Sequence, residues 1–184
     1  MRRKDRQMNE DFALDVIDKS EFGVLGIYKE SIYTMPLSMV RDGKNLYFHS
    51  APEGKKVDMI EDGDNVSVSF VSRVQVPNLL SREDILEKIA EKKFAEIGSK
   101  VFTTEFESAH VEGKIFHIKD ETETIEALML IGKKYTPDLV DLAEEFIKNS
   151  LHRTRVYKII IEEIKGKRKK FDELGEEMKF GRME

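Results

Sequence analysis

The sequence predicts a mainly β fold, a small six-stranded antiparallel barrel with helices at its margins. Six apolar runs rich in β-branched residues are separated by turn signals, and most of them come early in the chain. Strands and helices do not alternate regularly, which disfavours a doubly wound parallel sheet. Rolling six strands into a barrel leaves no long exposed edge.

Turn residues set the limits of the expected strands. The Asp42-Gly43 pair is a hairpin signal and predicts that the first three strands form an antiparallel meander. Pro36 cannot donate a ladder hydrogen bond, so we expect an edge or a split in the sheet there. Gly113 is the expected position of a β-bulge. The strands are expected over residues 22–28, 32–41, 46–50, 66–76, 106–118 and 155–164.

Helices are expected where apolar residues recur with a helical period. Asn9 caps a helix that runs through Lys19 and should lie on the end of the barrel. Ser81 and Asp84 make a capping-box-like start for a single inserted helix over residues 81–97. Residues 1–166 are expected to form one domain, followed by a loose, charged tail over residues 167–184. The remaining helices are expected over residues 57–60, 122–135 and 138–151.

Composition excludes several classes of protein. The 184 residues include 31 basic and 36 acidic side chains, a net charge of −5, so a nucleic-acid partner is not expected. Cysteine is absent, which excludes disulfide scaffolds, thiolate zinc sites and cysteine nucleophiles. No apolar run reaches ~18 residues and the start lacks a signal segment, so we expect a cytoplasmic protein with no membrane partner.

The most informative stretch is residues 46–58, where a strand passes through a tight loop into a short helix. An imidazole, a hydroxyl and two amines converge beside a helix start, a combination that suits a phosphate monoester. An ordinary polar loop with two solvated lysines is the alternative. The spacing does not match a phosphate-binding Walker loop, and no dinucleotide-binding glycine motif occurs in the chain. The residues concerned are His49, Ser50, Gly54, Lys55 and Lys56.

Other polar groups make weaker signals. The proline-broken run 33–40 would expose backbone groups able to pair with a flat heterocycle, or it is an edge strand without a ligand. His110, Glu112 and His117 suggest a metal, but in a strand His117 points away from the other two, so we expect no metal site. The five basic residues within 165–170 are interpreted as a solvated strand end.

These motifs together resemble the 5-nitroimidazole-resistance (Nim-type) branch of the pyridoxamine 5′-phosphate oxidase-like FMN-binding split barrels. The likeness continues through Ser108, Gly113 and Lys114 and through the late strand with Tyr157, so it spans most of the chain. The matching segments are Met1-Arg-Arg-Lys-Asp-Arg6, Met35-Pro-Leu-Ser38, Leu46-Tyr-Phe-His-Ser-Ala51 and Gly54-Lys-Lys56.

The resemblance implies a six-stranded Greek-key split barrel that forms a homodimer, with FMN in grooves between the subunits. It implies that Met35, Pro36, Leu37 and Ser38 line the isoalloxazine ring. It also implies that the loop residues hold the phosphate side of FMN or face the flavin, and that His49 contacts the substrate as the candidate catalytic residue. The implied cofactor-binding set is completed by His49, Ser50, Ala51, Gly54, Lys55, Lys56 and Ser108.

Two departures from the family pattern concern the ligand groove. Glu107 stands where family members carry an arginine, and the helix over 81–97 is an enlarged segment that could narrow or cover the groove. The leading hypothesis is an FMN-dependent oxidoreductase that acts on a small, flat, electron-poor molecule, as a nitroimidazole reductase or a pyridoxamine phosphate oxidase relative would. The alternatives are an FMN or haem carrier of the same fold without turnover, and a plain protein-interaction domain.

Overall fold

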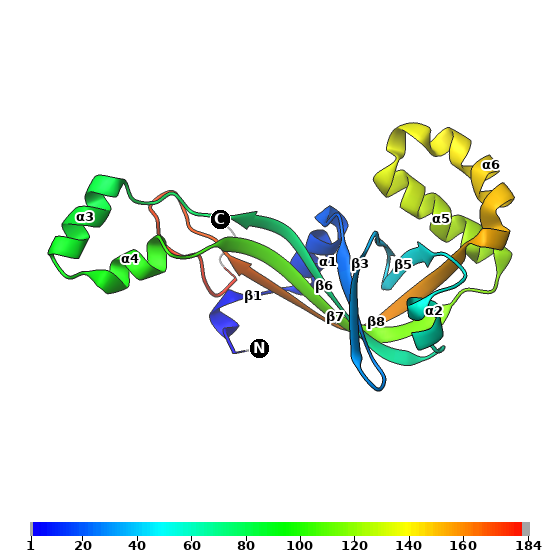
Figure 1. Cartoon of the computed structure of the whole chain (residues 1–184). Helices are drawn as coiled ribbons and strands as arrows, with labels where there is room; N and C mark the ends of the chain where they lie inside the picture. Colours follow the sequence, from blue (N-terminus) through cyan, green and yellow to red (C-terminus); the bar gives the residue numbers. More distant parts are fainter. Residues whose placement is uncertain (1, 182–184) are drawn as a thin grey trace.

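The computed structural model describes residues 2–181 and shows an antiparallel sheet with helices at both ends (Figure 1). The strands are β1 (Gln7–Met8), β2 (Gly23–Tyr28), β3 (Ile32–Leu37), β4 (Val40–Asp42), β5 (Asn45–Ser50), β6 (Asp64–Gln75), β7 (Glu105–His117) and β8 (Arg155–Lys169). The α-helices are α1 (Glu10–Lys19), α2 (Lys55–Met59), α3 (Arg82–Ala90), α4 (Phe94–Lys100), α5 (Glu121–Tyr135) and α6 (Val140–Ser150). Short 3₁₀ turns lie at Lys4–Arg6, Pro137–Leu139 and Leu151–Arg153.

The sheet confirms the predicted fold class but has eight strands within the described residues rather than six. Its strands follow the order β3-β2-β6-β7-β8-β5-β4, and β1 pairs separately with β8. The run expected as one strand over 32–41 is broken at Ser38 and Met39, so β3 and β4 lie at opposite ends of this order. The expected three-strand meander is therefore wrong, although Asp42-Gly43 does form the β4–β5 hairpin, with Gly43 at φ 55°.

The break between β3 and β4 shows why the sheet is a split barrel. Only Ser38 and Met39 separate Leu37 from Val40. A chain of this length spans at most about 10 Å, so the two ends of the strand order must approach each other there. Because β3 and β4 each pair with a different neighbour and not with one another, the sheet curls round without closing. Pro36 lies on the edge strand β3, as its missing N–H predicts.

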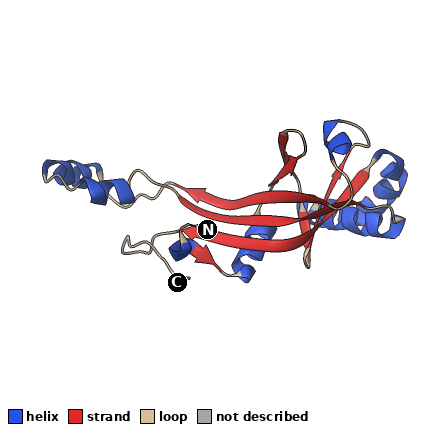
Figure 2. Cartoon of the chain, turned by 90° about the horizontal axis from the view of Figure 1, so that it is seen from below, coloured by secondary structure: helices blue, strands red, loops and turns tan. Residues whose placement is uncertain are grey.

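Strands β6, β7 and β8 are the long central strands and run past the barrel at one end (Figure 2). The register between β7 and β8 shifts at Glu112 and Gly113, which confirms the expected bulge. Gly113 is required there because a Cβ atom would lie 2.2 Å from the carbonyl oxygen of Ile160. The prolonged β6–β7 pair ends in the insertion formed by α3 and α4, which projects away from the barrel (Figure 1).

The insertion differs from its prediction because it contains two helices instead of one. Ser81 and Asp84 form the capping box at the start of α3, as expected. The chain then leaves the helix at Lys92, whose φ of 60° lies in the left-handed region, and α4 begins at Phe94. The amphipathic pattern continues across this break, so its period alone could not locate it.

The segment after Gly166 is structured, and the expectation of a loose tail is wrong. Strand β8 continues to Lys169, and the side chains of Arg168 and Lys169 are buried rather than solvated. Beyond it the chain turns back, so that Phe171 forms an isolated bridge with Glu177 and Met178 is buried. Burial of two apolar side chains fixes a segment whose composition is otherwise charged.

Two apolar cores hold the fold. The larger core lies inside the barrel, where α1 packs on β6, β7 and β8. Asn9 caps the start of α1 by accepting a hydrogen bond from the Phe12 N–H. The smaller core lies on the opposite face, where α5 covers β4, β5 and the start of β8. No helix within residues 2–181 has the length and apolar character needed to span a membrane.

The end of α5 anchors the broken strand segment. The hydroxyl of Tyr135 accepts a hydrogen bond from the Met39 N–H at 2.9 Å and lies 2.8 Å from the Glu21 carbonyl, to which it donates. The Lys134 ammonium donates to the carbonyls of Ile17 and Met39 at 3.3 and 3.0 Å. These side chains therefore satisfy backbone groups that the strand break removes from the sheet ladder.

Replacing Tyr135 with phenylalanine should lower the free energy of unfolding by about 1–3 kcal/mol, because it leaves the Met39 N–H without its acceptor. Urea titration of the wild type and Y135F measures the difference. Y28F is the matched control, since the Tyr28 hydroxyl has no hydrogen-bond partner within residues 2–181 and its loss should change stability by less than ~0.5 kcal/mol. Equal stabilities for Y135F and Y28F would contradict the anchoring role.

Candidate functional site

Strand β5 delivers side chains to two different environments. Leu46 and Phe48 point into the barrel core, whereas Tyr47 and His49 lie on the opposite face, which α5 covers. This alternation is the ordinary two-residue period of a strand. The loop that follows β5 therefore begins beside the imidazole of His49 on one face and the ring of Phe48 on the other.

The loop after β5 turns sharply into α2. Gly54 has a φ of 113°, a conformation that favours glycine, and nothing lies within 4 Å of the position a Cβ atom would take. Helix α2 has only five residues, so the helix-dipole argument for anion binding is weaker than the sequence suggested. The hydroxyl of Ser50 is already engaged, because it donates to the Ala51 carbonyl at 2.8 Å. Positive charge at this loop comes from its two lysine side chains.

Both lysine side chains lie over aromatic rings of the barrel strands. The Nζ atom of Lys55 lies 4.8 Å from the ring centroid of Tyr33 on β3, and the Nζ atom of Lys56 lies 5.6 Å from that of Phe48. Within residues 2–181 neither ammonium forms an ion pair with a carboxylate. Lys56 is partly buried, and this desolvation lowers its pKa.

A partly buried ammonium without a carboxylate has a free-energy cost that a bound anion would remove. A phosphate monoester also accepts hydrogen bonds from two amines at once. The donor set of Lys55 and Lys56, with the open space beside Gly54, thus fits the phosphate of a cofactor.

His49 lies at the mouth of a cavity rather than in the anion loop itself. Its neighbours there include Ser38 from the strand break and Tyr135 from α5. Desolvation lowers the pKa of His49, and the nearby positive charge of Lys56 lowers it further. The neutral imidazole is therefore the favoured form near pH 7, and it can donate one hydrogen bond and accept another.

The residues expected to line an isoalloxazine ring do not all face outward. Met35 and Leu37 pack against the barrel core, whereas Pro36 is exposed and Ser38 lines the cavity beside His49. Pro36 thus lies on the opposite face of β3 from Tyr33, whereas Met35 and Leu37, only partly buried, share the face of Tyr33. The cation–aromatic contact of Lys55 with Tyr33 brings the same strand next to the anion loop.

Ser108 lies far from the other predicted site residues in one chain. Both residues pair with β8: Ser108 of β7 lies opposite Lys167, and His49 of β5 lies opposite Val156. Val156 precedes Lys167 by eleven residues. Eleven strand residues correspond to roughly 35 Å, so Ser108 cannot share a ligand with His49 of the same chain. The Ser108 hydroxyl instead donates to the Lys167 carbonyl at 3.4 Å.

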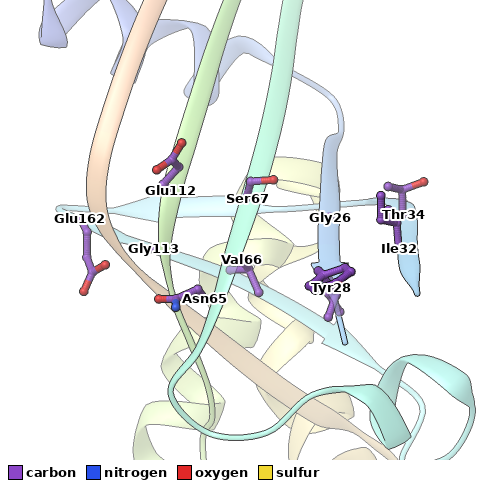
Figure 3. A pocket seen from close by; sticks show the side chains of 11 residues that line it. Gly26, Tyr28, Ile32, Thr34, Asn65, Val66, Ser67, Glu112, Gly113 and Glu162 are labelled. Atoms are coloured by element: carbon purple, nitrogen blue, oxygen red, sulfur yellow. The ribbon is translucent and has the colours of Figure 1, made fainter. Parts of the chain in front are cut away.

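A second concavity of about 460 Å³ lies on the outer face of the sheet, across β2, β3, β6, β7 and β8 (Figure 3). Gly26 and Ser67, paired between β2 and β6, line its centre with little side-chain bulk, and the carboxylates of Glu112 and Glu162 lie along one side. None of its lining residues is positively charged. This concavity is therefore unsuited to a phosphate-bearing ligand.

The possible metal ligands do not assemble. His110 contacts Ser69 at 3.3 Å and lies 3.6 Å from Glu112, and His117 instead packs on the ring of Tyr157. Within residues 2–181 no group of three or more histidine, cysteine, aspartate or glutamate side chains could hold a metal ion.

Several residues of the site carried no signal in the sequence. Tyr33 was not singled out, although its alternation with Met35 in the expected strand places it on the same face. Tyr135 and the apolar residues of α5 and α6 were missed because helical periodicity suggested ordinary core packing. Their relation to His49 depends on contacts across some 80 to 100 residues of chain, which no local motif encodes.

Comparison with known proteins supports the resemblance. Residues 9–79 match the family model described as pyridoxamine 5′-phosphate oxidase. This region contains the strand break and the anion loop. No curated protein matches the sequence significantly.

Solved structures share the fold at low sequence identity. A candidate 5-nitroimidazole antibiotic resistance protein from Bacteroides thetaiotaomicron aligns with a TM-score of 0.61 and 22% identity over 86% of this chain and 83% of its own. An FAD- and haem-binding protein from Mycobacterium smegmatis aligns with a TM-score of 0.66 and 15% identity over 89% of this chain and 73% of its own. An FAD-binding protein from the same organism aligns with a TM-score of 0.58 and 15% identity over 90% of this chain and 99% of its own. The match over residues 9–79 and the shared fold confirm that the chain resembles the pyridoxamine 5′-phosphate oxidase-like split barrels, among them a 5-nitroimidazole-resistance protein.

Proposed function

We propose that the protein binds FMN and is an oxidoreductase that reduces a small, electron-poor molecule. One observation carries the proposal: Lys55 and Lys56 place two ammonium groups, without carboxylate partners within residues 2–181, over the rings of Tyr33 and Phe48 on the barrel strands. A phosphate that bridges them would pair both charges and relieve the desolvation of Lys56. Similar folds described as FAD-binding and as FAD- and haem-binding proteins support a flavin in this architecture.

The protein's own residues would bind and orient the cofactor. When bound, FMN would supply the electron transfer, for which no side chain in the site is suited. Lys55 and Lys56 would hold the phosphate, and the partly buried side chains of Met35 and Leu37, on the Tyr33 face of β3, would limit how the ring lies. The anchoring of Met39 by Tyr135 keeps this segment in place. His49, neutral near pH 7, would hydrogen-bond to the substrate or to the ring.

We also propose that two copies assemble through the outer face of the sheet. This face exposes several large apolar side chains, and it includes the paired small residues Gly26 and Ser67. Such a patch is typical of an interface. The cofactor contact that the resemblance implies for Ser108 is compatible with this assembly, because a Ser108 so far from His49 could reach the cofactor only from the second copy. The exposed apolar side chains are Val24, Tyr28, Ile32 and Val71.

FMN should bind to the wild-type protein with quenching of its fluorescence. The double variant K55A/K56A should bind FMN at least ~100-fold more weakly. Each charge-assisted hydrogen bond contributes about 1.5–3 kcal/mol, and 1.4 kcal/mol corresponds to a factor of ten in affinity. Fluorescence titration measures both proteins. Riboflavin, which lacks the phosphate, should bind the wild type and the double variant with similar, weak affinity.

The adjacent pair in the insertion supplies the matched control, K92A/K93A, which should leave FMN affinity unchanged. A wild-type protein that fails to bind FMN or FAD would refute the proposed function. Equal FMN affinity of K55A/K56A and wild type would refute the phosphate assignment alone. Reduction of the loaded protein by NADH or NADPH, followed by reoxidation with a nitroaromatic, distinguishes an enzyme from a flavin carrier.

The pKa of His49 should lie below the ordinary value of ~6.5 and should rise in K56Q. Desolvation and the Lys56 charge both disfavour the imidazolium, so removing the charge reverses the second cause. NMR titration of the imidazole nitrogens measures both proteins. Because the folded-state pKa is depressed, His49 should also destabilise the fold as pH falls below ~6.5, and this loss should be smaller in K56Q. An unchanged His49 pKa in K56Q would contradict the coupling.

The wild type should sediment at twice the 21.3 kDa chain mass, and V24K/Y28K should sediment as the single chain. The two added charges would be buried without partners in the proposed interface. Analytical ultracentrifugation measures both. L174K is the control, because it places the same charge at an exposed apolar residue in the turn after β8. A dimer that survives V24K/Y28K would place the interface elsewhere.

A further inference from the structure

A cavity of about 550 Å³ lies between helices α5 and α6 beside His49. The two helices form a hairpin connected by Thr136 and the Pro137–Leu139 turn. Each helix turns one stripe toward the other, since the lining residues recur at intervals of three and four. Ser38 and His49 complete one end. The helical lining residues are Leu128, Ile131, Gly132, Tyr135, Leu139, Leu142, Ala143, Phe146 and Ile147.

The apolar stripes of α5 and α6 face each other, but their side chains do not fill the space between the helices. Ile131 and Ile147 are buried, but Leu139, Leu142 and Phe146 remain 56%, 53% and 74% exposed although they line the cavity. Inward-facing apolar side chains in a helix pair ordinarily bury one another, because apolar area in contact with water raises the free energy. The exposed area is therefore available to a ligand that fills the space.

Gly132 adds to the space at the centre of the cavity. It lies inside α5, where glycine is less favourable than alanine. Packing does not require it, because a Cβ atom there would lie 3.8 Å from the Ala143 Cβ and 3.9 Å from the Thr136 hydroxyl, both ordinary contacts. The glycine thus keeps open a volume that a larger side chain would occupy.

The polar groups of the cavity are concentrated at one end. The hydroxyls of Tyr135 and Thr136 are engaged by backbone atoms of Met39, Glu21 and Gly132. Ser38 and His49 remain at the mouth, and the imidazole has no hydrogen-bond partner within residues 2–181. No lysine, arginine, aspartate or glutamate lines the cavity. A phosphorylated molecule would therefore lose its hydration there without gaining a counter-charge.

We propose that this cavity binds a small, uncharged, mainly apolar organic molecule whose one polar group meets His49. The volume lies within the range of ordinary small-molecule pockets. That this molecule is the substrate rests on the flavin function proposed above; the class of ligand rests on the cavity alone. The two proposed sites would therefore differ in preference: phosphate at Lys55 and Lys56, and an uncharged apolar molecule between α5 and α6.

The probe for this cavity is 2-methyl-1,4-naphthoquinone, which is flat and uncharged; the chain has no cysteine with which it would react. Methyl NMR spectra of the flavin-free protein should show shifts for Leu128, Ile131, Leu142 and Ala143 on titration. G132L should weaken binding by about tenfold or more, because the leucine occupies the cavity. F146A should weaken it as well, and its wild-type side chain is largely exposed, so folding is unaffected. Pyridoxine 5′-phosphate, a flat dianion, should not shift these methyl groups.

G98L is the matched control. Gly98 also lies in a helix and has nothing within 4 Å of its Cβ position, so the same substitution should leave naphthoquinone affinity unchanged. Absence of shifts at the cavity methyl groups, or equal affinity of G132L and G98L, would overturn the proposal. FMN titration of the same samples keeps the outcomes apart. Naphthoquinone binding without FMN binding refutes the oxidoreductase, whereas FMN binding without cavity shifts refutes the cavity.

Discussion

The short connection between β3 and β4 is the constraint on which the structure depends. Ser38 and Met39 must cross from one end of the strand order to the other, which forces the sheet to curl and leaves it split at this point. Backbone groups at the crossing are removed from the ladder and must find other partners. Tyr135 and Lys134 supply them, so the position of α5 follows from the split as much as from its apolar face. The cavity beside His49 exists because α5 is held there.

The alternation of β5 connects the two halves of the candidate site. Phe48 and His49 are adjacent in the chain but lie on opposite faces of the strand. Lys56 lies over the ring of Phe48 on the core side, and its charge still lowers the pKa of His49 on the other side. An anion bound at the lysines would offset that charge and make the imidazole more basic. Occupancy of the proposed phosphate site would in this way be coupled electrostatically to the protonation of His49.

Local chemistry explains which parts of the fold could be predicted from the sequence. The Asn9 cap, the Asp42-Gly43 hairpin, the Gly113 bulge and the break near Pro36 each depend on the conformational limits of one or two residues. The separation of β3 from β4, the left-handed turn at Lys92 and the folded tail depend on contacts between distant segments. The period of the apolar residues does not predict these contacts, because the same apolar residue can face the core or another helix.

The site shows the same division. The anion loop could be located because its residue types lie within a few positions of one another, from His49 to Lys56. The direction in which each side chain points could not be predicted, because it depends on the register of β5 with β8 and on the face of the sheet that α5 covers. Met35 and Leu37 illustrate this: their place in a motif suggested contact with a ring, and the strand period packs them, partly buried, against the core.

Glu107, at the position where the resemblance implies an arginine, gives the two lysines greater weight in the proposed site. Glu107 lies opposite Arg168 in the register of β7 and β8, and it also accepts a hydrogen bond from the Ser72 hydroxyl at 3.3 Å. Its carboxylate favours the charged form of Arg168 and thereby opposes the desolvation that lowers the pKa of this buried guanidinium. A carboxylate at this position repels a phosphate where an arginine would attract one. Strand β7 is thus no substitute for the loop, and the charge of a phosphate bound there must be met by Lys55 and Lys56.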